Sequence, residues 1–176
     1  MNIEPKLSVI MGIYNTEDKD ILNNAIMSIL NQTYSNFEFI ICNDGSTDGS
    51  CQYIKEYAKK DKRIVVISNP MNLGLAKTLN NCIEVAKGEY IARMDADDIS
   101  KINRFEEQIA FLESHSEYAF VGCCAELINE NGIYLYCSLI NDELYDVEIV
   151  KKLSTKNTYI RVKDDLTIYV TTNHLV

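Results

Sequence analysis

Residues 37–60, FEFIICNDGSTDGSCQYIKEYAKK, contain one complete unit of strand, loop and helix. The apolar run FEFIICN predicts a buried strand, and the glycine, serine and aspartate residues of DGSTDGS predict a loop. In CQYIKEYAKK, the three-to-four spacing of apolar residues predicts a helix that directs Ile54, Tyr57 and Ala58 inward. Similar units precede and follow this one.

The alternation of strands and helices extends on both sides of residues 37–60. Strands are predicted at residues 7–14, 63–68 and 89–94, and helices at 21–32, 75–88 and 102–115. Because each helix returns the chain to the same edge of the sheet, successive strands pair in parallel through right-handed crossovers. The sequence therefore predicts an α/β fold with a doubly wound, mostly parallel sheet and helices on both faces.

Local signals predict how several helices begin, end and face the sheet. Gly88 fits the left-handed residue that often follows a helix, and Ser100 can cap the helix at 102–115. The first helix places one set of apolar residues on a single face: Ile21, Leu22, Ala25, Ile26, Ile29 and Leu30.

The alternation stops near Ala125. Asn131-Gly132 lies between two apolar runs, which is typical of a β-hairpin, and TYIRV and TIYV predict two further short strands. We therefore expect residues 1–125 to form the wound core. We expect residues 126–176 to form an antiparallel portion with a hairpin, a helix and short strands, incomplete as a domain.

Composition excludes several classes of protein. A 176-residue chain that is 47% hydrophobic can form one domain with a full core. Its formal charge of −9 argues against nucleic acid as a partner, because such binding depends on clustered Lys and Arg. The 6 cysteines lack metal-ligand spacing, which indicates reduced thiols in a cytoplasmic protein. We recognise no signal peptide or transmembrane segment, so we expect any peripheral contact with the cytosolic face of the membrane to come from missing parts.

Polar residues follow each predicted strand of the core. In an open parallel sheet, ligands bind beyond the carboxyl ends of the strands. Those positions hold Asn15 and Thr16, then Asp44-Gly45-Ser46, then residues 69–74, and finally Asp95-Ala96-Asp97-Asp98. Four loops are therefore expected to bring polar groups to one edge of the sheet.

The loop DADD suits a divalent cation. Asp95 and Asp97 are two residues apart, so in an extended segment both carboxylates face the same way. Mg²⁺ and Mn²⁺ favour one or two carboxylates together with water and substrate phosphates. The sequence predicts Mn²⁺ or Mg²⁺ on these aspartates, where the ion would neutralise a departing diphosphate. The alternative is that the loop only caps the next helix and lies in water.

Two other polar residues admit two interpretations each. Asp44 can accept hydrogen bonds from a nucleotide base, or it can belong to a turn in which Ser46 or Thr47 caps the next helix. Both can be true together. Lys77 can reach a phosphate from the first turn of the third helix, or it can be a solvated surface lysine.

These residues, in this order, resemble the inverting glycosyltransferases of family 2, which have the Rossmann-like GT-A fold. The resemblance rests on five motifs: SVIMGIYN (8–15), NDGSTDGS (43–50), NLG (72–74), GEYIARMDADD (88–98) and NRFEEQ (103–108). It implies that the region of Tyr14 and Asn15, together with Asp44, holds the nucleotide base and ribose. It also implies that Asp95 lies near the ribose and metal and that Asp97 is the metal ligand.

The resemblance implies a substrate site and a reaction. We assign to substrate binding Tyr14, Asn15, Asp44, Gly74, Lys77, Asp95 and Ala96. In this family a carboxylate base deprotonates the acceptor hydroxyl, and a single displacement at the anomeric carbon inverts its stereochemistry. The donor is usually a UDP-sugar and the acceptor a glycan or lipid-linked sugar, as in polysaccharide biosynthesis. Residues 1–125 would bind the nucleotide sugar, and residues 126–176 would be part of the acceptor side.

The sequence departs from the family pattern at three places. Gly12 and Ile102 stand where the family commonly has proline, and both changes are tolerable. The acidic pair that normally supplies the catalytic base has no close match. Asp164-Asp165 is the only nearby pair, so Asp165 is the one candidate, with a solvated turn between two strands as the alternative.

Other functions are open or disfavoured to different degrees. The main alternative is a non-catalytic module that binds a nucleotide sugar and a metal, or an inactive truncated glycosyltransferase. Binding of a UDP-sugar without transfer would identify it. A haloacid-type phosphatase is disfavoured because its DxD follows the first strand, and a dinucleotide-binding protein because no GxGxxG follows that strand.

Overall fold

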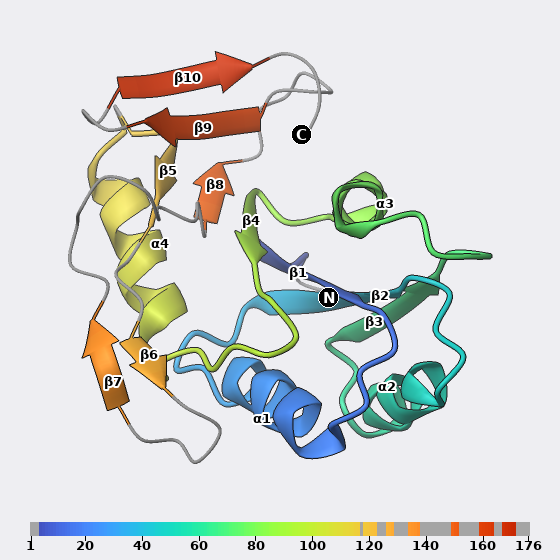
Figure 1. The fold of residues 1–176 in the computed structure, drawn as a ribbon. Helices are drawn as coiled ribbons and strands as arrows, with labels where there is room; N and C mark the ends of the chain where they lie inside the picture. The colour runs from blue at the N-terminus through green and yellow to red at the C-terminus, as the bar shows by residue number, and fades with distance from the viewer. Residues whose placement is uncertain are drawn as a thin grey trace.

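The computed structural model describes residues 4–116 and 118–122 in full and, beyond them, the backbone of five short strands. A 6-stranded sheet in the order β3-β2-β1-β4-β8-β5 forms the centre of the molecule (Figure 1). Its parallel part consists of β1 (Leu7–Ile13), β2 (Phe37–Asn43), β3 (Ile64–Ser68) and β4 (Tyr90–Arg93). The predicted parallel α/β core is confirmed.

Helices cover both faces of this sheet. Those described are α1 (Lys19–Leu30), α2 (Ser50–Lys60), α3 (Leu75–Val85) and α4 (Arg104–Ser114). The helices α1, α2 and α4 share one core cluster with Val9 and Met11 of β1, whereas α3 packs with Ile10 on the opposite face. Alternate residues of one strand thus serve two cores. Within the described part of the chain, no helix has the length and apolar character needed to cross a membrane.

The strand β2 shows why the run FEFIICN is apolar throughout. All seven of its residues are buried, because β1 and β3 flank the strand and helices cover both of its faces. Strands buried on both sides lack the alternation of polar and apolar residues that marks a half-exposed strand. The prediction of a fully buried strand at residues 37–43 is confirmed.

The antiparallel portion follows the wound core. The strand β8 (Ile149–Lys151) lies between β4 and β5 (Phe120–Val121) and is antiparallel to both. The predicted hairpin corresponds to β6 (Glu126–Ile128) and β7 (Tyr134–Cys137), and β9 (Tyr159–Lys163) pairs with β10 (Thr167–Thr171). No helix is described between residues 126 and 176, so the one predicted there lies outside the described residues. The division at residue 125 stays a prediction, although β8 contributes a later strand to the core sheet.

Gly88 does not end a helix in the left-handed conformation. The helix α3 ends at Val85, and among the described residues the glycines with positive φ are Gly45, Gly49 and Gly74. A Cβ atom at position 88 would instead lie 2.5 Å from the backbone nitrogen of Ser8. Close approach to β1, rather than a helix cap, therefore requires glycine here.

The predicted helix caps are also wrong. The residue before α4 is Asn103, and Ser100 instead accepts a hydrogen bond from the side chain of Gln32. The residue before α2 is Gly49, so neither Ser46 nor Thr47 caps that helix. Both residues instead form hydrogen bonds with Asn15 in the loop after β1. Residues near them in the sequence give no sign of this contact.

The inward face of α1 is narrower than predicted. Leu22, Ala25, Ile26 and Ile29 are buried, and Leu30 packs partly against them, but Ile21 is 42% exposed. Ile21 lies in the first turn of α1 and is not among the buried residues of this helix.

Candidate functional site

The carboxyl ends of the parallel strands meet at one edge of the sheet. The backbone N–H of Asp44 donates to the carbonyl of Ile13 at 2.8 Å, and that of Met94 donates to the carbonyl of Ile10 at 3.0 Å. Both contacts extend the pairing of β1 with its neighbours on either side. Asp44 and the acidic loop at 95–98 therefore leave the sheet at the same edge, as the sequence predicted.

Asp44 is a buried carboxylate that holds the loop after β3. It is 3% exposed, and its Oδ1 accepts hydrogen bonds from Asn69 Nδ2 at 2.7 Å and from the backbone N–H of Leu73 at 2.8 Å. Its Oδ2 accepts from the N–H of Gly74 at 2.9 Å. Burial alone would raise the pKa of Asp44, but these hydrogen bonds outweigh burial and lower it. Its predicted contact with a nucleotide base stays a prediction.

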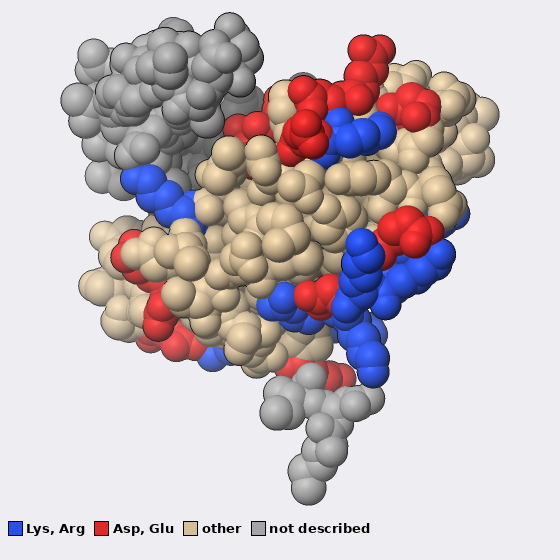
Figure 2. All heavy atoms as spheres, turned by 90° about the horizontal axis from the view of Figure 1, so that it is seen from below, with Lys and Arg blue, Asp and Glu red and all other residues tan. Residues whose placement is uncertain are grey.

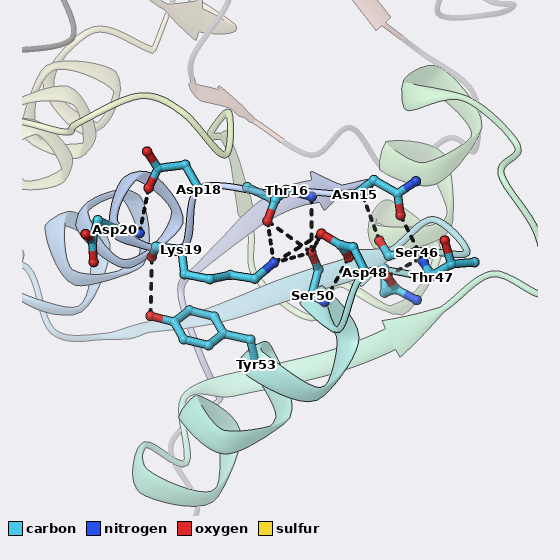
Figure 3. A network of polar contacts seen from close by, with 11 residues as sticks. Asn15, Thr16, Asp18, Lys19, Asp20, Ser46, Thr47, Asp48, Ser50 and Tyr53 are labelled. Carbon is cyan, nitrogen blue, oxygen red and sulfur yellow. Dashed lines mark hydrogen bonds and ion pairs between the residues drawn. The ribbon is translucent and has the colours of Figure 1, made fainter.

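Asn15 joins the loop after β1 to the loop after β2 (Figure 3). Its φ of 45° is in the left-handed region, which asparagine tolerates better than most residues. Its N–H donates to Ser46 Oγ at 3.0 Å, and its Oδ1 accepts from the N–H of Thr47 at 2.9 Å. The side chain of this predicted substrate-binding residue thus fixes the two loops to one another.

Lys19 strengthens the same junction and was missed by the sequence reasoning. Its Nζ donates to Asp48 Oδ2 at 3.1 Å and to Ser50 Oγ at 2.9 Å, and also to the carbonyl of Thr16. The pKa of Asp48 is lowered to about 2, mainly by its hydrogen bonds with Ser50 and to a smaller extent by the hydrogen bond from Lys19. The local signal was Asp48 two residues before Ser50, which is typical of an Asx turn at a helix start.

The acidic loop after β4 differs from its predicted conformation. Residues 96–97 form a turn in which the N–H of Asp98 donates to the carbonyl of Asp95 at 3.4 Å, so the segment is not extended. The extended conformation predicted for Asp95 and Asp97, in which both carboxylates would face the same way, is therefore wrong. Asp95 is half-buried and paired with Arg93, whereas Asp97 is exposed. Whether Asp95 and Asp97 bind a metal stays a prediction.

The donor set of this loop fits a hard divalent cation that brings further ligands with it. Three aspartate carboxylates lie within four residues, and oxygen is the ligand that Mg²⁺ and Mn²⁺ prefer. Among the described residues, however, no three His, Cys, Asp or Glu side chains are arranged to enclose an ion. The residues thus suit a site completed by water and phosphate rather than an all-protein cage.

The remaining predicted residues that the structure describes also belong to this edge. Tyr14 follows β1 and is 50% exposed, and Ala96 lies in the turn of the acidic loop. Gly74 has a φ of 84° and precedes α3, whose first turn carries the exposed Lys77. Asp165 lies outside the described residues.

Charge is distributed unevenly over the face that α1 and α2 cover. Asp18 and Asp20 stand at the start of α1, near the candidate site, whereas Lys59 and Lys60 are in the last turn of α2. Figure 2 shows a group of acidic side chains at the top edge of this face and a group of basic ones at its lower right. The arrangement follows the helix dipoles and leaves the site edge acidic.

Known proteins with similar sequences identify the family of this chain. The chain is 48% identical to the putative glycosyltransferase EpsE of Bacillus subtilis over 134 residues, which cover 76% of this chain and 48% of EpsE. It is 38% identical over 112 residues to the Escherichia coli UDP-Glc:alpha-D-GlcNAc-diphosphoundecaprenol beta-1,3-glucosyltransferase WfaP, covering 64% of this chain and 43% of WfaP. The chain thus spans about half the length of EpsE, and somewhat less of WfaP.

A solved structure and a family model agree with these relatives. The S. aureus protein TarS, in complex with UDP, superposes with a TM-score of 0.58 at 28% identity, covering 63% of this chain and 33% of the TarS chain. The model of glycosyl transferase family 2 matches residues 8–176. With its parallel sheet and the loops that meet at the carboxyl edge, the chain belongs to glycosyl transferase family 2.

Proposed function

We propose that the protein acts as an inverting glycosyltransferase that transfers a sugar from a UDP-sugar to a glycan or lipid-linked acceptor, assisted by Mn²⁺ or Mg²⁺. The observation that carries the proposal is the convergence of Asp44 and the DADD loop on one edge of the sheet. Ligands of open parallel sheets bind at this edge. Membership of glycosyl transferase family 2 supports the transfer reaction. Because the chain spans about half the length of EpsE, we propose this activity for the whole protein rather than for the chain alone.

Support for the donor and acceptor comes from the relatives. TarS binds UDP in its solved complex, and the name of WfaP specifies UDP-glucose and a sugar linked to diphosphoundecaprenol. A nucleoside diphosphate would contact the edge where Asn15 and Asp44 hold three loops together. These residues would preorganise the binding surface, which reduces the entropy lost when a ligand binds.

The acidic character of this edge supports a role for a divalent cation. Asp18 and Asp20 stand near the same edge as the DADD loop, so an anionic diphosphate would meet repulsion without a counterion. Asp97 would hold the cation, with Asp95 beside it. When bound, the cation supplies stabilisation of the negative charge that develops on the departing diphosphate. For the acceptor proton we propose Asp165 as the base.

We further propose that the protein works in the cytoplasm, at the cytosolic face of the membrane. The lipid-linked acceptor in the name of WfaP supports contact with a membrane surface. Fractionation of cells that express the full-length protein would test this location.

Calorimetric titration of UDP in the presence and absence of Mn²⁺ tests the proposal. We expect binding that depends on Mn²⁺, and we expect Asp97→Asn to lose this dependence. Glu84→Gln, an equal change of charge on an exposed residue of α3, is the matched control and should leave binding unchanged. Absence of UDP binding in the wild type would contradict the function, and equal binding without the metal would contradict the role of the cation.

Turnover must be measured separately from binding. A transfer assay with UDP-sugars and lipid-linked acceptors should release UDP in an acceptor-dependent reaction. Mn²⁺-dependent binding of UDP without turnover on any acceptor would instead favour the non-catalytic module.

A further inference from the structure

The guanidinium of Arg93 binds both oxygens of the first aspartate of the DADD loop. Arg93 is the last residue of β4, and its Nε donates to Asp95 Oδ1 at 3.2 Å while Nη2 donates to Oδ2 at 2.8 Å. About a third of each side chain is exposed. Such a two-pronged contact fixes the orientation of a carboxylate better than a single ion pair does.

Asp97 is in a different situation. It is exposed, and no hydrogen bond or ion pair joins its side chain to another residue in the part of the chain that the structure describes. A cation that approaches the free protein therefore meets one readily available carboxylate, Asp97, and one that already has a positive partner. The positive charge of Arg93 also repels a divalent ion at short range.

From this geometry we propose that Arg93 makes binding of the divalent cation conditional on the nucleoside diphosphate. The inference rests on the proposed function, because it concerns the same cation and nucleotide. Mg²⁺ and Mn²⁺ usually bind proteins through one or two carboxylates plus substrate phosphates. A diphosphate supplies oxygen ligands to the ion and offers the guanidinium an alternative anionic partner. Without it, Arg93 keeps Asp95 from contributing fully to the site.

Such conditional binding is a thermodynamic coupling between two ligands. If UDP raises the affinity for Mn²⁺ by some factor, Mn²⁺ must raise the affinity for UDP by the same factor. Removal of Arg93 should therefore have two linked effects. The affinity for Mn²⁺ alone should rise, and the factor by which UDP increases that affinity should fall.

The chain provides a closely matched control pair. Arg63 binds Asp61 in the same way, with Nε to Oδ1 at 3.1 Å and Nη2 to Oδ2 at 2.7 Å, across the same separation of two residues. Arg63 immediately precedes β3, at the edge of the sheet opposite to the DADD loop, and is exposed to a similar degree. Arg63→Met removes the same charge from the protein without touching the candidate site.

The experiment measures Mn²⁺ affinity of the full chain by calorimetry, with Mn²⁺ alone and with saturating UDP. For Arg93→Met we expect the affinity for Mn²⁺ alone to rise about tenfold, which is within the usual range of such couplings. The factor by which UDP increases the affinity for Mn²⁺ should fall by a similar amount. Arg63→Met should stay within about twofold of wild type in both measurements. Arg93→Lys keeps the charge but cannot bind both oxygens, so a rise of about threefold is expected.

The outcomes separate this inference from the proposed function. If the wild type shows no Mn²⁺-dependent binding of UDP, the proposed function fails. If it does, but Arg93→Met binds Mn²⁺ alone no more tightly than Arg63→Met, the role of Arg93 is wrong. Circular dichroism verifies folding of each variant. If Arg93→Met does not fold, the test uses Arg93→Lys instead. An affinity of Arg93→Lys for Mn²⁺ alone that is no higher than that of Arg63→Met would overturn the inference.

Discussion

At the scale of single residues, the candidate site depends on backbone conformations and close contacts that few side chains tolerate. Asn15, Gly45 and Gly74 all have positive φ, with values of 45°, 73° and 84°. Gly45 is also closely packed, because a Cβ atom there would lie 2.5 Å from the carbonyl carbon of Met71. The loop after β2 thus approaches the loop after β3 directly next to Asp44, which binds that loop through hydrogen bonds.

Substitution of Gly45 tests this packing. Gly45→Ala should destabilise the protein by roughly 3 kcal/mol and weaken UDP binding, because it combines a left-handed conformation with a backbone clash. Gly49→Ala is the control, since Gly49 has a φ of 88° but no neighbouring atom within 4 Å of the place that an alanine Cβ would take. It should cost only about 1 kcal/mol. Urea unfolding and UDP titration of both variants measure the difference, and equal losses would contradict the packing argument.

At the scale of secondary-structure elements, the end of α1 fixes the segment that leads from the acidic loop into α4. Gln32 is 6% exposed, and its Nε2 donates to Ser100 Oγ at 3.2 Å and to the carbonyl of Lys101 at 2.7 Å. Its Oε1 accepts from the N–H of Phe105 at 3.1 Å, in the first turn of α4. Ser28 Oγ accepts from the N–H of Ser100 at 3.0 Å. Ser28 of α1 and Gln32, just after the end of α1, therefore supply the hydrogen bonds that fix the start of α4.

Loss of the Gln32 side chain should affect both stability and the acidic loop. Gln32→Ala leaves the buried N–H of Phe105 without this acceptor, which should cost about 1–3 kcal/mol and weaken Mn²⁺-dependent binding of UDP. Gln52→Ala removes an exposed glutamine of α2 that pairs with Glu56, and should change stability by less than about 0.5 kcal/mol. Thermal unfolding and calorimetry compare the two variants. Equal stability of both would show that the contact between α1 and α4 contributes little.

At the scale of the whole molecule, the wound core depends on a strand from beyond residue 125. The strand β8 separates β4 from β5 and pairs with both, whereas β9 and β10 pair with each other in a separate two-stranded sheet. Without β8, one edge of β4 would expose unpaired backbone groups, and β5 would lose its partner in the sheet. Exposed strand edges promote association with other chains.

Two truncated chains test how far the core extends. A chain that ends at residue 125 should unfold at a lower temperature and aggregate, because it lacks β8. A chain that ends at residue 158 keeps β8 and, of the strands that the structure describes, lacks only β9 and β10, so it should retain more of the full-length stability. Size-exclusion chromatography and thermal unfolding provide the comparison. A monomeric 1–125 chain as stable as the 1–158 chain would instead support the predicted boundary at residue 125.

Whether the sequence predicts a structural feature correctly depends on how far apart in the chain the residues that determine the feature lie. The strand at Phe37–Asn43 has the predicted bounds, because an apolar run between turn residues is a local signal. The roles of Gly88 and Ser100 were predicted wrongly because each depends on a residue distant in the chain. Gly88 packs against the backbone of Ser8, and Ser100 accepts a hydrogen bond from Gln32. The turn at residues 96–97 was missed because a short DxD pattern does not specify its own backbone conformation.

The sequence by itself determined the order of strands and helices, and with it the edge of the sheet to which Asp44 and the DADD loop belong. Periodicity and short connections are properties of neighbouring residues, and parallel pairing follows from them. Only the tertiary structure decided the partner of each polar group, such as Asp48 for Lys19 and Phe105 for Gln32, which are 29 and 73 residues apart in the chain. Those pairings depend on how packed elements bring side chains together, which no local pattern encodes.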